Sequence, residues 1–254
     1  MTRSSPFPVL GLSPWPFLGG AASLVLGIGL VLFMHDWGPE VLILGVGALL
    51  WVFGGWWRDM LREAKGPYPA VVAQGLRIGF GLFIASEVMF FVGFFWGFLD
   101  ASLTSPKWPP PTIHPIDPFD WPYLNTLILL LSGTTLTSAY QGMLEGCRKE
   151  FLQGLGLTIG LGILFTMVQA YEYGHATFGF RDGIYPSVFY MATGFHGLHV
   201  LIGVAFLSFC WIRAWRHGIN PKQHVGFEAA CWYWQFVDVV WLLLFVVVYW
   251  WGGQ

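Results

Sequence analysis

The run GIYPSVFYMATGFHGLHVLIGVAFLSFCWI, residues 183–212, contains no Asp, Glu, Lys or Arg. A helix needs about 20 apolar residues to cross the hydrocarbon core of a bilayer, so this run is long enough to span one. His196 and His199 lie in its middle, and Asp238 lies in the middle of the next apolar run, residues 229–251. Ionisable groups at such depth cost about 2.5–3.5 kcal/mol each, so we expect them to mark a site with a structural or chemical role.

The composition indicates an integral membrane protein. Hydrophobic residues make up 56% of the chain and charged residues only 10%, whereas soluble domains carry about 25% charged residues. The net charge of −2 says little, because in a membrane protein the position of the charges matters more than their sum. The first apolar run, residues 16–34, is too long for the core of a cleavable signal peptide, so we expect it to be a span.

Hydropathy predicts seven spans, and a bilayer admits only helices or closed barrels. The segments are too long for strands and show no alternation, so the predicted fold class is an all-α membrane bundle. We expect the second span to be the shortest, and the third and sixth to be the longest and tilted. No internal repeat is visible, which argues against an inverted-repeat transporter. The seven segments are residues 16–34, 41–57, 78–102, 123–145, 152–172, 185–212 and 228–251.

Basic residues orient the chain, because loops on the inner side of a membrane are enriched in Lys and Arg. The loops of one predicted side hold Arg3, Arg58, Arg62, Lys65, Arg77, Arg148, Lys149, Arg213, Arg216 and Lys222, and those of the other hold only Lys107 and Arg181. The distribution predicts an inner N-terminus, in the cytoplasm or matrix, and an outer C-terminus.

Two connections have distinctive compositions. Residues 58–77 are polar and basic and contain two prolines, so we expect a hinge between the first two spans and the rest. Residues 103–122 contain seven prolines and cannot be helical throughout, so we expect an ordered, extended cover on the outer face. The cysteines show no metal-binding or disulfide spacing, and we interpret them as small apolar fillers: Cys147, Cys210 and Cys231.

Glu87 lies at the centre of the third span, where an ionised carboxylate is unfavourable. The group is expected to be mostly neutral. One interpretation is a proton relay or a polar contact to a bound lipid. The other is a carboxyl that hydrogen-bonds to a neighbouring helix and stabilises the fold.

His196 and His199 are about 60° apart around a helix and share a face. With a carboxylate from a neighbouring helix, Asp238 or Glu172, they would resemble a metal-ligand set. The alternative is two neutral histidines bonded to carboxylates and carbonyls between helices. Asp238 needs a partner, and His196, His199 or a tryptophan N–H are candidates. Glu172 lies near the end of its span, so we do not expect deep burial.

The predicted inner surface combines aromatic and basic residues, which suits phospholipid head groups. One group lies just below the second span: Trp56, Trp57, Arg58, Asp59, Arg62 and Glu63. The other lies between the last two spans: Arg213, Arg216, His217, Lys222 and His224. The alternative is an ordinary pair of basic inner loops. Glu228 lies near this interface, where a charge is tolerable.

Several long motifs resemble subunit III of the haem–copper cytochrome c oxidases, from about residue 14 to the end. They are Pro14-Trp-Pro16, Trp56-Trp-Arg-Asp59, Leu76-Arg-Ile-Gly-Phe80, Ser86-Glu-Val88, Gly93-Phe-Phe-Trp96, Leu124-Asn-Thr126, Thr193-Gly-Phe-His-Gly-Leu-His-Val200, Gly226-Phe-Glu-Ala-Ala-Cys-Trp-Tyr-Trp-Gln-Phe-Val-Asp-Val-Val-Trp241 and Tyr249-Trp-Trp-Gly252. The chain departs from many members in having Gln223-His224 in place of two histidines, Gln235 in place of a histidine, and a shorter loop after Lys65.

The resemblance implies a seven-helix bundle in which the first two spans are splayed from the other five, around a V-shaped cleft that holds phospholipid. Residues 1–66 would form the N-terminal segment and two-helix arm, and residues 67–254 the five-helix bundle. The family is a core subunit of a proton-pumping aa3-type oxidase, and it has no catalytic centre, metal, haem or redox group of its own. The haems and copper belong to subunits I and II, and cytochrome c is met through the complex.

The resemblance also implies roles for particular residues. Phospholipid would contact Trp56, Trp57, Arg62, Glu63, Glu87, Arg213, Arg216, His224 and Gly226. Buried polar residues would hold the bundle together: His196, His199, Glu228 and Asp238. The subunit would support proton uptake, oxygen access and the stability of subunit I. The competing hypotheses from the residues are an intramembrane metalloenzyme that uses His196, His199 and Asp238, and a solute transporter.

Overall fold

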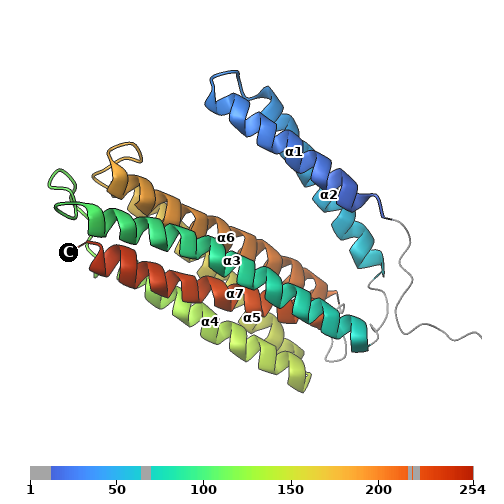
Figure 1. Ribbon diagram of the computed structural model, residues 1–254. Coiled ribbons are helices and arrows are strands. Elements are labelled where there is room, and N and C mark those ends of the chain that lie inside the picture. Colours follow the sequence, from blue (N-terminus) through green and yellow to red (C-terminus); the bar gives the residue numbers. More distant parts are fainter. Residues whose placement is uncertain (1–12, 64–69, 217–218, 220–223, 254) are drawn as a thin grey trace, which may run out of the picture. The chain divides into compact units, whose positions relative to one another are not determined.

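The computed structural model describes residues 13–63, 70–216, 219 and 224–253, and the side chains of Leu61 and Glu63 lie outside this description. The described residues form helices and no strand (Figure 1). The elements are α1 (Trp15–Met34), α2 (Glu40–Glu63), α3 (Ala70–Thr104), α4 (Trp121–Glu145), α5 (Arg148–His175), α6 (Ile184–Trp215), α7 (Val225–Leu244) and the π-helix η1 (Phe245–Trp251). With α7 and η1 taken together, seven helices are long and apolar enough to span a membrane, which confirms the predicted fold class.

Helix lengths confirm one expectation and correct two. The third and sixth helices are the longest, with 35 and 32 residues. The second is not the shortest, because α2 has 24 residues and α1 has 20. Much of the predicted 58–77 loop is helical, since α2 continues to Glu63 and α3 begins at Ala70. Hydropathy detects only the apolar core, whereas a helix satisfies its backbone hydrogen bonds equally well beyond it.

The chain forms two compact units, residues 1–74 and 75–254. The predicted division after residue 66 stays a prediction, because residues 64–69 lie outside the described part. In the first unit α1 and α2 form an antiparallel hairpin. A side chain on Gly29 or Gly45 would meet the backbone of the facing helix, so these glycines allow the close approach of α1 and α2. At the open end of the hairpin, Trp15 Nε1 donates to Asp59 Oδ2 at 2.8 Å.

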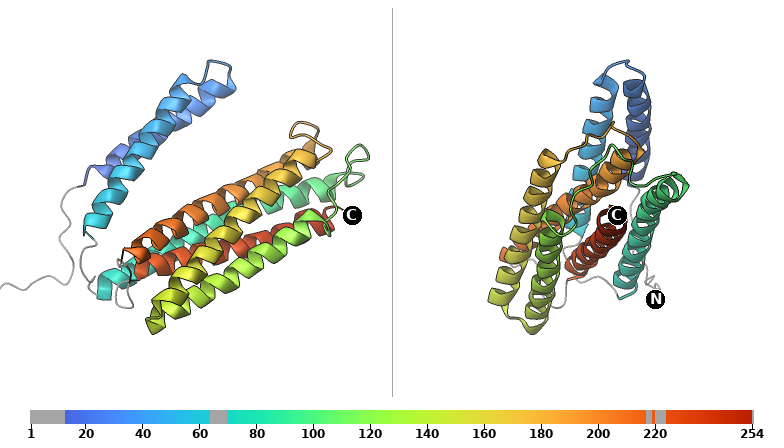
Figure 2. Two further views of the ribbon diagram at one scale, coloured as in Figure 1. Left: turned by 180° about the vertical axis from the view of Figure 1, so that it is seen from behind. Right: turned by 90° about the vertical axis from the view of Figure 1, so that its left-hand side faces the viewer.

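The core of the second unit lies among α4, α5, α6 and α7, with α4 beside α5 and with α3 on the opposite side of α7 (Figure 2). Trp234 and Trp241 of α7 are both fully buried. Their indole N–H groups donate to Ser132 Oγ and Thr126 Oγ1 of α4, each at 2.9 Å. These two tryptophans therefore join α7 to α4 through both apolar packing and hydrogen bonds.

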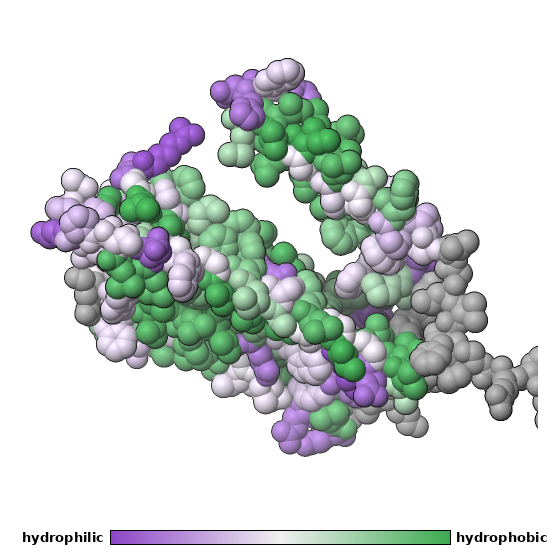
Figure 3. Space-filling model, viewed as in Figure 1, coloured by the Kyte–Doolittle hydropathy of each residue, from purple (hydrophilic) through white to green (hydrophobic). Residues whose placement is uncertain are grey.

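Aromatic rings fill the space between α3 and its neighbours. Phe90 and Phe94 pack against Phe195 of α6, with both pairs of ring centroids 5.2 Å apart. Phe91 packs against Phe236 of α7 at 6.0 Å. Apolar residues cover much of the visible surface of this unit, with hydrophilic ones concentrated toward its ends (Figure 3), as expected for a bundle that contacts lipid along its length.

The proline-rich connection between α3 and α4 is non-helical and ordered, as predicted. Trp108 Nε1 donates to the Gly252 carbonyl at 3.1 Å, and its ring packs against Phe98 and Tyr185 at 5.4 and 5.2 Å. Ile113 is buried in the same core. The side chains of Trp108 and Ile113 therefore anchor the connection to one end of the bundle.

Candidate functional site

A hydrogen-bonded pair joins α3 to α6 at mid-span. His199 Nε2 lies 2.9 Å from Glu87 Oε2, and the two side chains are 9% and 23% exposed, respectively. The pair borders the Phe91 ring, whose centroid is 5.0 Å from that of His199. His199 is therefore a partner on a neighbouring helix, as required by the interpretation in which the Glu87 carboxyl stabilises the fold.

The second nitrogen of His199 determines how many protons this pair holds. His199 Nδ1 lies 2.7 Å from the Phe195 carbonyl, which can only accept, so Nδ1 carries a hydrogen. One further proton is then shared between Nε2 and Glu87 Oε2. Whether it resides on nitrogen or oxygen, the pair has no net charge. A neutral pair suits the low dielectric of a membrane interior, where an isolated charge is costly.

His196 faces a different neighbour. Its Nε2 donates to the Val237 carbonyl of α7 at 3.1 Å, and the side chain is fully buried. Its ring lies between Phe165 and Trp241, at centroid distances of 5.7 and 5.2 Å. His196 therefore ties α6 to α7, while His199 ties α6 to α3.

Asp238 does not pair with either histidine. Its carboxyl lies over Gly133 of α4, where a β-carbon would collide with Oδ2. Asp238 Oδ1 is buried and has no partner among the described residues. The three candidate ligands His196, His199 and Asp238 thus face α7, α3 and α4 and do not converge, which argues against the metalloenzyme hypothesis.

Glu228 has a partner that sequence reasoning missed. Arg77 Nε of α3 lies 2.8 Å from Glu228 Oε2 of α7, and the side chains are 40% and 16% exposed, respectively. The sequence offers little signal for this pair, because the residues are 151 positions apart. The ion pair fixes the N-terminal part of α3 against α7.

Glu172 is a correction to the expected shallow position. It is 2% exposed, and its Oε1 accepts a hydrogen bond from Tyr249 Oη at 2.7 Å. The π-helix that follows α7 brings Tyr249 into the core, where it covers the end of α5. Hydropathy could not anticipate this cover, because it treats each span separately.

The predicted head-group residues are distributed over both units. Trp56 and Trp57 are about two-fifths exposed, and Arg62 lies 3.7 Å from Asp59. In the second unit Arg213 is in the last turn of α6, Arg216 directly follows that helix, His224 directly precedes α7, and Gly226 is in the first turn of α7. The side chain of Glu63, with His217 and Lys222, lies outside the described residues.

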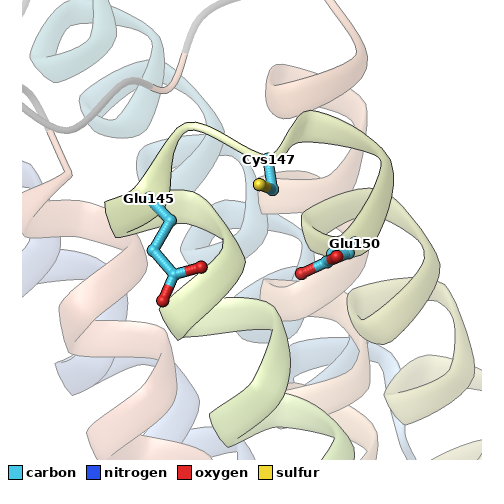
Figure 4. A group of neighbouring side chains, drawn as sticks. All are labelled: Glu145, Cys147 and Glu150. Carbon is cyan, nitrogen blue, oxygen red and sulfur yellow. The ribbon is translucent and has the colours of Figure 1, made fainter.

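Among the described residues, one group has the spacing of a metal site, and it includes neither His196 nor His199. Glu145, Cys147 and Glu150 lie at the turn between α4 and α5, with ligand atoms within 4.8 Å of one another (Figure 4). All three are exposed, which corrects the expectation that Cys147 is an apolar filler, while Cys210 and Cys231 are buried. Exposed acidic groups at a turn are common without any ion, so this group carries no assignment.

Comparison with known proteins identifies the family. The model of the family described as Cytochrome c oxidase subunit III matches residues 5–253. The chain belongs to the cytochrome c oxidase subunit III family. The proteins named cytochrome c oxidase subunit 3 from Dugong dugon and Scyliorhinus canicula are 50% and 49% identical, over 95% and 99% of both chains, respectively. That of Pylaiella littoralis is 48% identical over 99% of this chain and 96% of its own.

Membership in this subunit III family has direct consequences. The chain is a multi-pass integral membrane protein of the haem–copper oxidases of the aerobic respiratory chain. As a subunit III it belongs to a complex with other oxidase subunits. The Glu87–His199 pair and Asp238 therefore belong to a chain that is one part of a larger membrane complex.

Proposed function

We propose that this chain is a non-redox core subunit of a proton-pumping aa3-type cytochrome c oxidase, in which subunits I and II oxidise cytochrome c and reduce oxygen. The haems and copper then belong to those subunits, and this chain contributes no catalytic centre. The divergent orientations of His196, His199 and Asp238 support this assignment. The chain would be oriented with its N-terminus inside, in a bacterial plasma membrane or a mitochondrial inner membrane.

The observation that carries the proposal is a polar stripe on the membrane-facing side of α4 and α7. Thr134, Thr137 and Ser138 are exposed on α4, and Gln235 is exposed on α7. Asp238 is partly exposed and lies over Gly133, which precedes Thr134 on α4. Polar groups that face lipid at mid-span are unfavourable, whereas small and hydroxyl-bearing residues favour contact between helices. The stripe is suited to a helix of another oxidase subunit.

Phospholipid binding is the second part of the proposed role. Trp56, Trp57 and Arg62, with Glu63, would contact one set of head groups at the end of α2. Arg213, Arg216, His224 and Gly226 would contact another set where α6 ends and α7 begins. Aromatic rings at the interface combined with guanidinium groups favour phosphate-containing head groups. We further propose that α1 and α2 are splayed from α3–α7 and that phospholipid fills the cleft between them.

Support of proton uptake, oxygen access and the stability of subunit I completes the proposal. The Glu87–His199 pair is the group best suited to this role, because it is partly exposed on α3 and shares one proton. In the proposed cleft, Glu87 would lie beside bound phospholipid.

The decisive experiment is purification of the tagged chain from its native membrane in a mild detergent. We expect it to bring with it a complex that contains haem a and oxidises cytochrome c, with phospholipid that remains after washing. Isolation without haem a, or with stoichiometric metal bound to the chain itself, would contradict the proposed function.

Asp238→Leu is expected to weaken the attachment of the chain to the oxidase. The substitution removes the mid-span carboxyl from the polar stripe but leaves the chain's own hydrogen bonds intact, because Asp238 makes none with the described residues. The measurement is the fraction of the chain retained when the complex is washed with increasing detergent, with Val239→Leu, an exposed neighbour, as control. Equal retention of the two variants would rule out a docking role for Asp238.

Glu87→Gln is expected to leave assembly intact and to change lipid retention or the durability of turnover. The glutamine amide can donate to His199 Nε2 and preserve the hydrogen bond, but it cannot release a proton. The measurements are phospholipid per haem a and the rate at which the oxidase inactivates during sustained turnover. Lipid content and inactivation rate that both match the unmodified oxidase would exclude this role for Glu87.

A further inference from the structure

Four residues of α4, α5 and α6 bury polar atoms that have no hydrogen-bond partner among the residues that the structure describes. Asn125 of α4 is fully buried, and both its Oδ1 and its Nδ2 are unpartnered. Gln169 Oε1 and Glu172 Oε2 of α5 are also unpartnered, and these side chains are 5% and 2% exposed, respectively. His196 Nδ1 of α6 is the fifth such atom. None of the contacts described above uses them.

The packing of α5 against α4 places two of these residues at one level of the bundle. The rings of Trp121 and Tyr171 are in contact, with a centroid distance of 4.8 Å and an interplanar angle of 59°, which fixes the register of the two antiparallel helices. Asn125 is about one turn beyond Trp121 along α4, and Gln169 is about half a turn before Tyr171 along α5. The two amides therefore lie within one helical turn of each other on the buried faces of α4 and α5.

The packing of α6 against α5 brings His196 to the same level. Tyr173 Oη donates to Thr193 Oγ1 at 2.7 Å, which fixes the register of this second antiparallel pair. Gln169 is four residues before Tyr173 and His196 is three residues after Thr193, so both lie about one turn from that contact in the same direction. Three helices thus contribute unpartnered polar atoms to one cross-section of the core, with Glu172 one turn away.

The chemistry of these atoms specifies what could join them. His196 Nε2 donates to the Val237 carbonyl, so in a neutral imidazole Nδ1 can only accept. Asn125 Oδ1 and Gln169 Oε1 also accept, whereas Asn125 Nδ2 donates. A ligand for these atoms must both donate and accept hydrogen bonds, and the low dielectric of the bundle core favours an uncharged one. Water has these properties, and a buried water typically makes about three hydrogen bonds.

We propose that Asn125, Gln169, Glu172 and His196 line an internal hydration site in the core of α4, α5 and α6. With five unpartnered atoms and about three hydrogen bonds for each water, the site would hold about two water molecules. Water there joins three helices at a depth where a bilayer supplies none. It also hydrates the Glu172 carboxyl, whose other oxygen accepts from Tyr249.

The test is an electron cryo-microscopy map of the intact oxidase at a resolution that shows ordered water, with Asn125→Leu as the variant. We expect density within hydrogen-bond distance of Asn125 Nδ2 and Gln169 Oε1, and its weakening in the variant. Asn125→Leu is also expected to lower the temperature at which the chain dissociates from the complex, because leucine cannot bond to the remaining water. Gln141→Leu, which removes an exposed amide from the same helix, is the control. It should change neither the density at the site nor the dissociation temperature.

A dry site would give the opposite result. Without water, replacement of an unsatisfied amide by a leucine of similar size would leave the dissociation temperature unchanged or raise it. That outcome, or a map without density at the site, would overturn the proposal. Density at metal-ligand distances, with a matching metal in elemental analysis, would also overturn it. If Asn125→Leu does not assemble, the map of the unmodified oxidase still decides, and Asn125→Ser is expected to assemble with the water retained.

Discussion

Replacement of Trp234 by alanine is expected to destabilise the bundle by about 3–5 kcal/mol, the usual range for removal of a buried tryptophan. The side chain is fully buried, and its Nε1 donates to Ser132 Oγ at 2.9 Å. Its ring also lies against Gly162 and Gly203, and a β-carbon on Gly203 would come within 2.8 Å of it. Loss of the ring would leave a cavity lined by α4, α5 and α6. It would also leave Ser132 Oγ without its hydrogen-bond donor.

The free energy of unfolding can be measured by titration of the purified chain in mixed micelles with a denaturing detergent. Trp96→Ala is the matched control, because this tryptophan is 72% exposed and is expected to change stability little. Trp234→Phe should fall between the two, since it retains much of the ring but not the N–H group. Equal stability of the Trp234→Ala and Trp96→Ala variants would show that Trp234 does not pack in the core as described.

His199→Leu is expected to cost about 1–3 kcal/mol, because it leaves the Glu87 carboxyl without its partner in the interior of a span. The same loss should follow from Glu87→Leu, which leaves His199 Nε2 unpaired. The double variant should be less destabilised than the two single variants summed, with a coupling energy of about 0.5–3 kcal/mol, as is typical of residues in direct contact.

A double-mutant cycle measures this coupling, with the same unfolding titration applied to all four proteins. Pairing of either single change with Leu82→Ala, an exposed position on α3, supplies the control, for which the effects should add. Coupling no larger than in this control would mean that the 2.9 Å contact contributes nothing to stability.

The number and type of the spans follow from the sequence. A run such as residues 183–212 has no charged residue, and in a bilayer its backbone groups can be satisfied only within a helix or a closed barrel. The prolines between residues 103 and 122 likewise exclude a continuous helix there. The ends of α2 and α3 were not predictable in the same way, because Arg58–Glu63 and Ala70–Arg77 continue the helices beyond the apolar core.

The pairing of the buried polar residues was decided only by the tertiary structure. The sequence alone determined that Glu87, His196, His199 and Asp238 lie deep within spans and must therefore each have a role. It did not determine that His199 bonds to Glu87, that His196 bonds to the Val237 carbonyl, or that Asp238 lies over Gly133. The physical reason is that helical periodicity assigns a side chain to a face of its own helix, whereas its partner depends on the rotation and relative height of the neighbouring helices. Those are set by packing, here by the large rings of α3 and α7 and the glycines opposite them.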